Sequence, residues 1–489
     1  MKDRLLNYFK SDRHLWWTVT VIPGVYSILY LYTNNYTLVN SWYQFVGFIL
    51  LFIALPVIEI LILDLVFKKW LPSHREKLYW SYFFINLSII LSWSIYLGWR
   101  WKGLILVAAL SIISAFFLGK HYKKFVVLVG LMVILALYNF SYFYIERVAG
   151  WKEWTSTQEF ESFVFNKKPN IYLIQPDGFI GKKTAQNSMY KWENISFYDQ
   201  LESKGLKINY DYRSNYPTTL SANTALFTGQ HHYYDNGNME GELFHARNII
   251  MGQNATLNTL KSNGYTLNAI LEHSYLLLNH PKTAYDQLNV KEEDLHIMPD
   301  YELYKDIEKD LYDMIKLDKP EPQFYFVEIL QPGHIPTSSS NTDALKEGRK
   351  NYLQSLNSAT QILDNLILMI QQKDPQGIII IAADHGGFVG FGSTAQAYEK
   401  PVQDLELKQS LFNPLLAIKA PDDFRPFQKN IKSSIGVFPN VFAYLAGKPV
   451  PQDTLDNSSY IFIKKGESRG IYKYFNTRGE PVTEKVPLK

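Results

Sequence analysis

Three short segments of the 489-residue chain bring together acidic, hydroxyl and imidazole side chains. The most specific is the segment from Ile378 to Gly387, in which a β-branched, strand-like run leads directly into Asp384, His385 and two glycines. A carboxylate and an imidazole at the end of a buried strand can bind one hard or borderline cation, such as zinc or manganese. This segment is therefore predicted to form half of a metal site.

The other two segments supply a second carboxylate and a hydroxyl. Asp177 follows the predicted buried strand Ile171–Gln175 and precedes a glycine, as expected where a strand ends in a turn. Thr219 lies in the hydroxyl-rich stretch from Tyr216 to Gly229, at a predicted loop-to-helix junction. The backbone N–H groups and the dipole at a helix N-terminus favour a hydroxyl or a phosphate. Taken singly, a turn aspartate and simple helix capping remain alternative interpretations.

Together the three segments predict one catalytic site. Asp177, Asp384 and His385 would hold one divalent cation, and Thr219 would face it as a further ligand. The cation would lower the effective pKa of the hydroxyl and polarise a phosphoryl oxygen. Thr219 would then attack phosphorus and form a covalent phospho-threonine, which a second acceptor resolves.

The elements that must position these residues follow an alternating pattern after Trp154. Alternation of strands and helices favours an α/β domain with a mostly parallel sheet covered by helices on both faces, and chemistry at the carboxyl ends of the strands. The predicted strands are Ile171–Gln175, Thr266–Leu271, Phe324–Leu330 and Ile378–Ala382. The predicted helices are Ser196–Lys204, Ala255–Asn263, Asp300–Leu317 and Ala344–Gln372.

The first 150 residues have a different composition and contain five apolar runs. Most are near the ~20 residues that a helix needs to cross ~30 Å of hydrocarbon. We therefore expect a five-helix transmembrane domain over residues 1–150 and a catalytic domain over residues 151–489. The runs are Leu15–Tyr32, Trp42–Leu63, Tyr79–Trp99, Gly103–Leu118 and Phe125–Ile145.

Basic residues in alternate connections predict the orientation of these helices. They concentrate before the first run and in the second and fourth connections, whereas the first connection has no charge. Because basic residues mark the cytoplasmic side, the N-terminus is predicted to be cytoplasmic and the catalytic domain extracytoplasmic, in the periplasm or outside the cell. The basic residues are Lys2, Arg4, Lys10 and Arg13, then Lys68, Lys69, Arg75 and Lys77, then Lys120, Lys123 and Lys124.

Composition narrows the class of protein further. The formal net charge of +3 gives no indication of a nucleic-acid partner. The chain has no cysteine, which excludes disulfides, thiol nucleophiles and thiolate metal ligands. An exported domain must then rest on its own core, which is feasible at this length. With the five-helix plan, these features predict a multi-pass protein of a bacterial plasma membrane.

The order of the three segments resembles the alkaline-phosphatase superfamily over most of residues 170–450. Sulfatases, nucleotide pyrophosphatase/phosphodiesterases and phospholipid-dependent phosphotransferases share this order. In that family the nucleophile lies ten residues before the glycine of a Thr-Gly pair; here that glycine is Gly229, so the resemblance indicates Thr219 rather than Thr218.

Departures from the family pattern narrow the choice. Sulfatases convert a Cys or Ser in a defined context to formylglycine, and the run from Thr219 to Asn223 has neither that residue nor the arginine, which argues against a sulfatase. Enzymes with two metals have an Asp four residues before a His. Here Leu330 stands four before His334, and no histidine follows His385, so one metal is expected. The first metal ligand, usually Glu, is Asp177.

One metal, a threonine and five N-terminal helices resemble lipoteichoic acid synthases and lipid A phosphoethanolamine transferases. That resemblance implies transfer of a phosphoethanolamine or phosphoglycerol headgroup from a phospholipid donor to an envelope glycan or glycolipid. Those enzymes tend to have a further histidine soon after Asp-His, which the segment 388–396 lacks, so the substrate stays open. The alternative function is that of a membrane-tethered phosphodiesterase or phosphatase, that is, a sulfatase-like hydrolase that releases its product to water. A third possibility is a non-catalytic relative.

Further residues are candidates for the same site. His334, which precedes Ile-Pro as in the family, is predicted to contact phosphate or acceptor and to act as general acid or base. His231 and His232 follow Gly229 after one residue and are candidates for substrate binding, with a surface pair as the alternative. Asn223 could donate to a phosphoryl oxygen, with capping or packing as the alternative.

Overall fold

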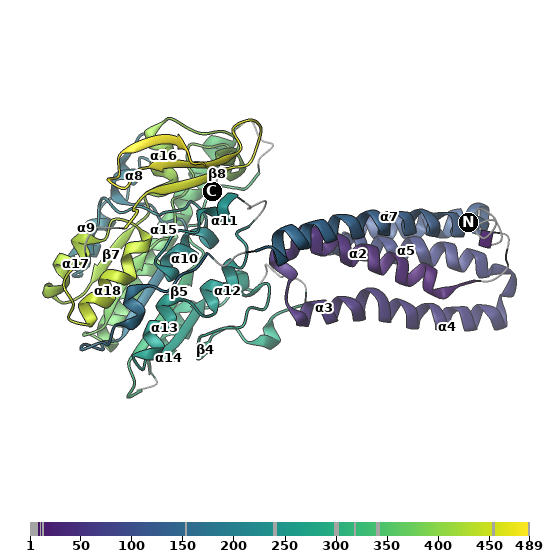
Figure 1. The fold of residues 1–489 in the computed structure, drawn as a ribbon, viewed down its shortest axis with the longest axis horizontal. Coiled ribbons are helices and arrows are strands. Elements are labelled where there is room, and N and C mark those ends of the chain that lie inside the picture. The colour runs from purple at the N-terminus through teal and green to yellow at the C-terminus, as the bar shows by residue number, and fades with distance from the viewer. Residues whose placement is uncertain are drawn as a thin grey trace. The chain divides into compact units, whose positions relative to one another are not determined.

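The chain, in a computed structural model, forms two compact units (Figure 1). The first comprises Met1–Glu153 with the short segments Leu278–His280 and His296–Asp300, and the second comprises Trp154–Leu277, Pro281–Leu295 and Tyr301–Lys489. The structure describes residues 8–9, 11, 14–151, 154–237, 242–297, 303–316, 319–338, 343–451 and 455–487.

The first unit is built from long apolar helices. A five-residue π-helical turn, Leu50–Ala54, joins α3 to α4 in one continuous helical stretch. Many outward-facing side chains are large and apolar; Phe117 is 77% exposed and Tyr138 is 70% exposed, as expected for surfaces that face lipid rather than water. The helices are α2 (Trp16–Val39), α3 (Trp42–Ile49), α4 (Leu55–Trp70), α5 (Arg75–Tyr96), α6 (Trp101–Leu118) and α7 (Tyr122–Phe143).

Each of the five predicted apolar runs is largely helical in the structure. Among the residues that the structure describes, three helical stretches are long and apolar enough to cross a membrane: Trp42–Trp70, Pro72–Tyr96 and Trp101–Ala149. The third contains both α6 and α7, and α2 is not among the three. The expectation of five crossings, and of their orientation, therefore stays a prediction. Of the basic residues behind that orientation, Lys2, Arg4, Lys10 and Arg13 lie outside the described residues.

The second unit is organised around a seven-stranded sheet in the order β2-β7-β6-β1-β5-β3-β4. The five strands from β6 to β4 run parallel, whereas β7 is antiparallel to both β6 and β2. The mostly parallel sheet expected from the sequence is thus confirmed. The strands are β1 (Ile171–Pro176), β2 (Lys207–Ile208), β3 (Thr266–Leu271), β4 (Gln287–Leu288), β5 (Gln323–Ile329), β6 (Ile378–Ala382) and β7 (Leu416–Lys419).

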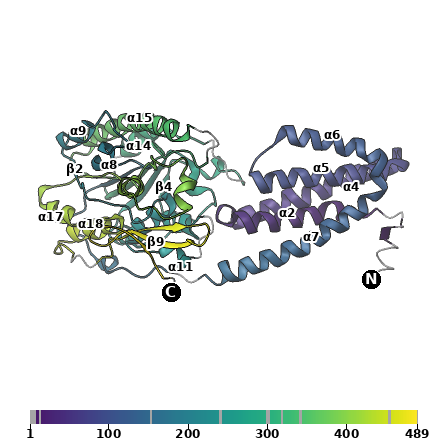
Figure 2. The ribbon, with the colours of Figure 1, turned by 90° about the horizontal axis from the view of Figure 1, so that it is seen from above.

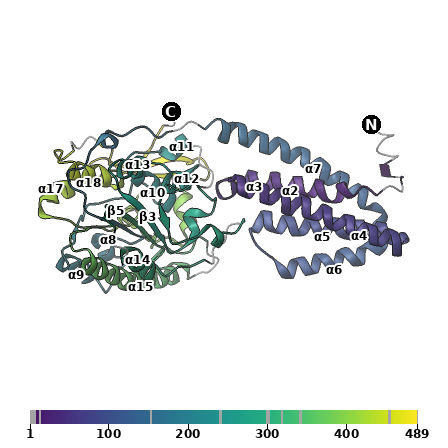
Figure 3. The same cartoon turned by 90° about the horizontal axis from the view of Figure 1, so that it is seen from below.

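Helices cover both faces of this sheet, with α9, α14 and α15 on one side and α10, α13 and α18 on the other (Figures 2 and 3). Alternate residues of β6 enter the two cores: Ile378 and Ile380 pack with one, Ile379 and Ile381 with the other. A strand that is buried on both faces has a continuous apolar sequence, and this pattern predicts β6 from the sequence alone. The helices are α9 (Phe197–Ser203), α10 (Thr219–Thr228), α13 (Ala255–Ser262), α14 (Ile307–Lys316), α15 (Ala344–Lys373) and α18 (Val437–Leu445).

The predicted helix Asp300–Leu317 begins later than expected, at Ile307, and its residues 300–302 and 317 lie outside the described residues. Five further helices are short: α8 (Lys182–Gln186), α11 (Tyr233–Gly237), α12 (Ala246–Met251), α16 (Leu405–Phe412) and α17 (Arg425–Asn430). A separate antiparallel sheet of β8 (Ser459–Ile463), β9 (Gly470–Phe475) and β10 (Pro481–Lys485) follows. This second sheet was not among the elements expected from the sequence.

Candidate functional site

The carboxyl ends of β1 and β6 bring the predicted acidic residues together. These strands are adjacent and parallel, with Ile174 opposite Ile381. Asp177 comes one residue after the end of β1, and Asp384 comes two residues after the end of β6. Because parallel strands end at the same edge of a sheet, residues far apart in sequence meet there.

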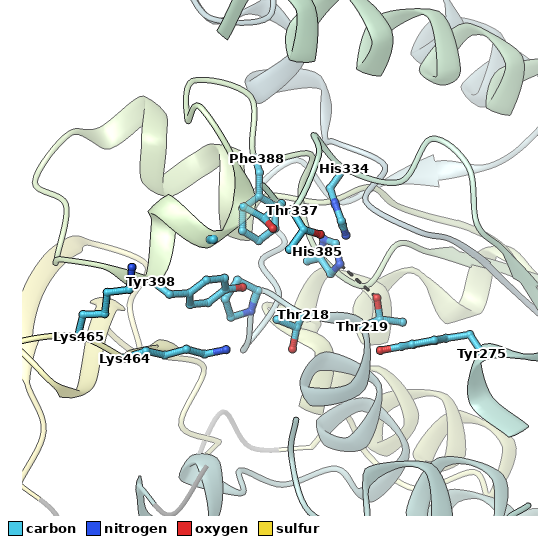
Figure 4. A pocket seen from close by; sticks show the side chains of 13 residues that line it. Thr218, Thr219, Tyr275, His334, Thr337, His385, Phe388, Tyr398, Lys464 and Lys465 are labelled. Atoms are coloured by element: carbon cyan, nitrogen blue, oxygen red, sulfur yellow. Dashed lines mark hydrogen bonds between the residues drawn. The ribbon is translucent and has the colours of Figure 1, made fainter. Parts of the chain in front are cut away.

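Four potential ligand atoms converge at this edge. The Nε2 atom of His385 lies 3.2 Å from Oδ1 of Asp177 and 3.4 Å from Oδ2 of Asp384. Oγ1 of Thr219 lies 3.3 Å from the same nitrogen (Figure 4, dashed line). The structure thus brings together all four residues that the sequence predicted as metal ligands. Their role as ligands stays a prediction.

The donor set fits a divalent cation. Oδ1 of Asp177 and Oδ2 of Asp384 are buried without a hydrogen-bond partner among the described residues, which costs free energy unless a cation satisfies them. The other oxygen of Asp384 accepts hydrogen bonds from the backbone N–H of Gly178 (3.0 Å) and His385 (2.9 Å). Nδ1–H of His385 donates to the carbonyl of Gly386 at 2.8 Å, which leaves Nε2 as the ligating atom.

The electrostatics of the protein alone favour protons at this site. Burial, with the nearby charge of Asp384, raises the pKa of Asp177 to about 7. Burial alone would lower the pKa of His385, but Asp384 and Asp177 more than offset it, so that this pKa is raised. A divalent cation inverts this balance, because it stabilises the ionised carboxylates and the neutral imidazole.

A tight turn holds the two strand ends in register. Gly178 has φ +65°, and a Cβ atom at this position would lie only 2.0 Å from the carbonyl oxygen of Gly333. Gly333 in turn donates its N–H to the carbonyl of Asp177 at 2.9 Å. Only glycine permits both the left-handed backbone and this close approach. The turn at Gly178 therefore fixes the position of the neighbouring Asp177. The backbone N–H of Gly178 also holds Asp384, by donating to its Oδ1 atom.

Thr219 is the first residue of α10, so its hydroxyl sits where the helix N-terminus favours negative charge. Thr218 is the N-cap residue in an extended conformation, and its side chain makes no capping hydrogen bond. Both threonines line the same pocket, but it is Thr219 that reaches His385. The choice of Thr219 as the nucleophile agrees with this placement and stays a prediction.

A pocket of about 330 Å³ opens beside Thr219 and His385 (Figure 4). His334 lines it, with its ring centroid 6.0 Å from that of His385. Burial and the neighbouring His385 lower the pKa of His334, so its imidazole is neutral at pH 7. Its Nδ1–H donates to the carbonyl of Ile335 at 2.7 Å, which fixes the tautomer and makes Nε2 the acceptor nitrogen.

The three predicted substrate contacts lie elsewhere. Asn223 is fully buried and exchanges side-chain amide hydrogen bonds with Gln175 of β1, in one direction at 2.8 Å. His231 is held between the hydroxyl of Tyr216 (2.9 Å) and the carbonyl of Asp456 (2.5 Å).

His232 is also tied to internal partners. Its Nε2–H donates to the carbonyl of Ser221 at 3.1 Å, and its Nδ1 accepts from the N–H of Tyr234 at 2.9 Å. Burial lowers the pKa of His232 to about 3, which keeps the ring neutral. None of Asn223, His231 and His232 is among the described residues that line the pocket, so substrate binding by them stays a prediction without geometric support.

The structure adds pocket residues that the sequence did not single out: Tyr275, Phe388, Tyr398, Lys464 and Lys465. The two lysines share the turn after β8 and Tyr398 ends a short 3-10 helix, whereas Tyr275 and Phe388 lie beyond β3 and β6. No local pattern in the sequence marks such positions. In Figure 4 the ring of Tyr275 extends toward Thr219, whereas Lys464 approaches Thr218 from the opposite side. His273, at a strand end in the sequence, packs instead against Tyr304 with ring centroids 5.2 Å apart.

The chain is similar in fold to known proteins, and its sequence matches the model of a known family. Among solved structures, the chain is similar to the zinc complex of the C-terminal periplasmic domain of EcEptC from Escherichia coli, with 13% identity, 66% of this chain and 97% of that chain covered, and a TM-score of 0.45. It is also similar to the integral membrane protein lipooligosaccharide phosphoethanolamine transferase A from Neisseria meningitidis, with 13% identity, 76% of each chain covered and a TM-score of 0.44.

A third similar structure is the putative sulfatase yidJ from Bacteroides fragilis, with 14% identity, 66% of this chain and 87% of that chain covered, and a TM-score of 0.42. No curated protein has a matching sequence. The sequence model of the family described as sulfatase matches residues 169–445, more than half of the chain and the whole segment that carries Asp177, Thr219, Asp384 and His385. The chain therefore belongs to the sulfatase family, within the alkaline-phosphatase superfamily.

Proposed function

We propose that this chain is a membrane-bound, metal-dependent phosphotransferase. It would move a phospholipid headgroup, phosphoethanolamine or phosphoglycerol, to an envelope glycan or glycolipid through a phospho-threonine. One observation carries the proposal: the hydroxyl of Thr219 lies at the helix N-terminus and 3.3 Å from His385, where two unsatisfied carboxylate oxygens also converge. A hydroxyl so placed is suited to attack an anionic phosphorus centre.

Asp177, Asp384, His385 and Thr219 would hold one divalent cation, zinc or manganese. When bound, the cation would supply Lewis-acid activation of the hydroxyl and neutralise charge on the phosphoryl oxygens. The absence of cysteine, together with threonine at the nucleophile position, argues against the formylglycine chemistry of a sulfatase. Phosphoryl transfer by a hydroxyl needs no such conversion.

In the first half-reaction the oxygen of Thr219 forms a bond to phosphorus as the bond from phosphorus to the diacylglycerol oxygen breaks. The departing oxygen takes up a proton, which balances the proton that Thr219 gives up. His334 is the neutral imidazole that lines this pocket and can carry that proton at Nε2. Diacylglycerol and phospho-Thr219 are the products.

In the second half-reaction an acceptor hydroxyl displaces Thr219 from phosphorus. His334 takes the acceptor proton, and the oxygen of Thr219 regains one, so the enzyme returns to its starting state. The N-terminus of α10 stabilises the negative charge in both steps. With water as the acceptor the same steps would make the protein a tethered hydrolase.

Access to a lipid donor is the reason for the membrane part. We propose residues 1–150 as a multi-pass transmembrane domain with a cytoplasmic N-terminus, and residues 151–489 as a catalytic domain outside a bacterial plasma membrane. Three helical stretches of suitable length and apolarity, and the apolar side chains exposed on them, support insertion.

The experiment uses the full-length protein in detergent with zinc or manganese and a mixture of labelled phosphatidylethanolamine and phosphatidylglycerol. The expected result is release of diacylglycerol and a mass adduct on Thr219 that names the headgroup. Thr219→Ala is the control, and it should form neither product. Hydrolysis of a soluble phosphodiester that depends on Thr219, without any lipid turnover, would replace the transferase by the tethered hydrolase.

A further inference from the structure

The wall of the pocket opposite Thr219 is supplied by the turn after β8. Lys464 directly follows β8, and its backbone N–H donates to the carbonyl of Tyr398 at 2.8 Å. Its Nζ atom lies 5.1 Å from the centre of the Tyr398 ring, within the range of a cation–π interaction. In Figure 4 the side chain of Lys464 extends toward Thr218. Two contacts therefore aim this ammonium group at the pocket.

The charge of this wall is unbalanced. Among the described residues that line the pocket, two are lysines and none is acidic. Lys465 is neutralised by Glu399, whose carboxylate lies 2.7 Å from its Nζ atom. In the described part of the chain, Lys464 Nζ makes no ion pair. Burial lowers the pKa of Lys464 and the carboxylate of Glu242 opposes this, but Glu242 is itself paired with Arg247 at 2.6 Å, so the charge of Lys464 is available to a ligand.

Two hydroxyl groups accompany this lysine. The hydroxyl of Tyr398 is buried and has no hydrogen-bond partner among the described residues, and the side chain of Thr218 makes no capping hydrogen bond. A buried, unsatisfied hydroxyl costs free energy unless a ligand pairs with it. An ammonium and two hydroxyls together can all donate to one oxyanion.

We propose that Lys464, Tyr398 and Thr218 form a second anion-binding subsite in the pocket, which selects substrates with a second oxyanion on the side away from Thr219. This inference rests on the proposed transfer at Thr219 and deepens it. An ammonium-bearing headgroup finds no carboxylate among the described residues that line the pocket and is repelled by Lys464, whereas a phosphate or carboxylate is bound. With either headgroup proposed above the oxyanion belongs to the acceptor glycan, because ethanolamine is cationic and glycerol is neutral; an oxyanion on the donor would mean a different headgroup.

Three soluble probes test the subsite, since they share a phosphate and carry different charges at the far end. They are glycerol bisphosphate, glycerol phosphate and phosphoethanolamine, with an anionic, a neutral and a cationic far end. Their dissociation constants are measured by calorimetry on the zinc-loaded, full-length protein at low ionic strength. We expect glycerol bisphosphate to bind about tenfold or more tightly than phosphoethanolamine, as one charge-assisted hydrogen bond provides.

Variants then assign this preference. Lys464→Gln should reduce the ratio of the two dissociation constants to within about twofold, and Lys464→Arg should keep most of it. Lys485→Gln is the matched control, because this exposed lysine of β10 is not among the described residues that line the pocket, and it should leave the ratio unchanged. Melting temperatures of all variants show that they are folded. A ratio near one in the unaltered protein, or a ratio that Lys464→Gln does not change, overturns the subsite.

The two half-reactions identify the source of the oxyanion. If Lys464→Gln slows release of diacylglycerol without acceptor, the oxyanion is on the donor; if it slows only resolution of phospho-Thr219, the oxyanion is on the acceptor. Failure of the proposed function has a different signature, in which no probe binds and no lipid turns over. If lipid turnover depends on Thr219 but Lys464→Gln leaves the ratio of the two dissociation constants unchanged, the subsite is refuted and the proposed function is not.

Discussion

Oγ1 of Thr219 lies 3.3 Å from Nε2 of His385, although the two residues are 166 positions apart in the sequence. The hydroxyl is presented by the first turn of α10, and the imidazole by the loop after β6. The contact also brings Thr219 beside Asp177 and Asp384, which lie 3.2 and 3.4 Å from the same nitrogen. The four residues therefore share one site, and a change at any one of them should affect it.

Replacement of Thr219 tests the nucleophile. Thr219→Ala should lower turnover of the lipid donor by at least about 10³-fold, because the variant lacks the hydroxyl that forms the covalent intermediate. Thr219→Ser keeps a hydroxyl and should retain measurable turnover with an adduct on residue 219. Thr218→Ala is the matched control and should still form the adduct. An adduct that persists in Thr219→Ala would move the nucleophile elsewhere.

Replacement of a ligand tests the metal site. Asp384→Asn should abolish retention of the one metal ion expected per chain, measured by elemental analysis after dialysis. The unaltered protein should be stabilised by saturating zinc, on the order of 4 kcal/mol at a thousandfold excess over the dissociation constant, and the variant should not be. Two ions per chain in the unaltered protein would contradict the expectation of one metal.

The stability of the metal-free protein should depend on pH with a defined sign. Asp177 has a pKa of about 7 in the folded chain, against its usual 3.8, so the folded state binds more protons between these values. The free energy of unfolding should therefore fall as the pH rises from about 4 to about 7. The raised pKa of His385 acts in the same direction, because the stability from its protonated form is lost as the pH rises.

Melting temperatures across this pH range check that prediction. Saturating zinc should remove most of the fall, because the bound cation keeps both carboxylates ionised in the folded state. The difference between the metal-free and zinc-loaded curves isolates this site from other titrating groups. Parallel curves with and without zinc would show that Asp177 is not part of the metal site.

Gly178→Ala tests the turn that positions the carboxylates. The new Cβ would lie 2.0 Å from the carbonyl oxygen of Gly333 in a backbone with φ +65°. We expect a loss of at least about 3 kcal/mol in the free energy of unfolding and weaker metal binding. Gly205→Ala is the control, since its φ is +84° but nothing lies within 4 Å, so it bears only the strain of the backbone. Equal losses for both variants would refute the close-approach argument.

Asn223→Ala separates packing from substrate binding. It removes the partner of Gln175 inside the core, so the free energy of unfolding should fall by about 1–3 kcal/mol. The KM for the lipid donor should not change, because Asn223 is absent from the described lining of the pocket. Asn223→Gln adds one methylene to the side chain and should also destabilise the core. A raised KM at unchanged stability would restore the substrate role.

The elements that carry the site were predictable because each has a local signature. The strands Thr266–Leu271 and Ile378–Ala382 have the bounds that the sequence predicts. Ile378–Ala382 is a continuous apolar run, as expected for a strand buried on both faces, whereas Asn268 interrupts the apolar residues of Thr266–Leu271. Asp177, Asp384 and His385 could be placed together because parallel strands end at one edge. The distances between these three residues agree with that placement, while their roles as metal ligands stay a prediction.

What the sequence by itself determined is therefore the position along the chain of four strands, β1, β3, β5 and β6, and the residues at their ends, which depend on local periodicity. Only the tertiary structure decided that Asn223, His231 and His232 have internal partners, because burial depends on contacts between distant segments. The structure likewise decided that Lys464 and Tyr398 face Thr218 across the pocket. They lie on turns after the predicted core, where side-chain direction is set by packing and has no period along the chain.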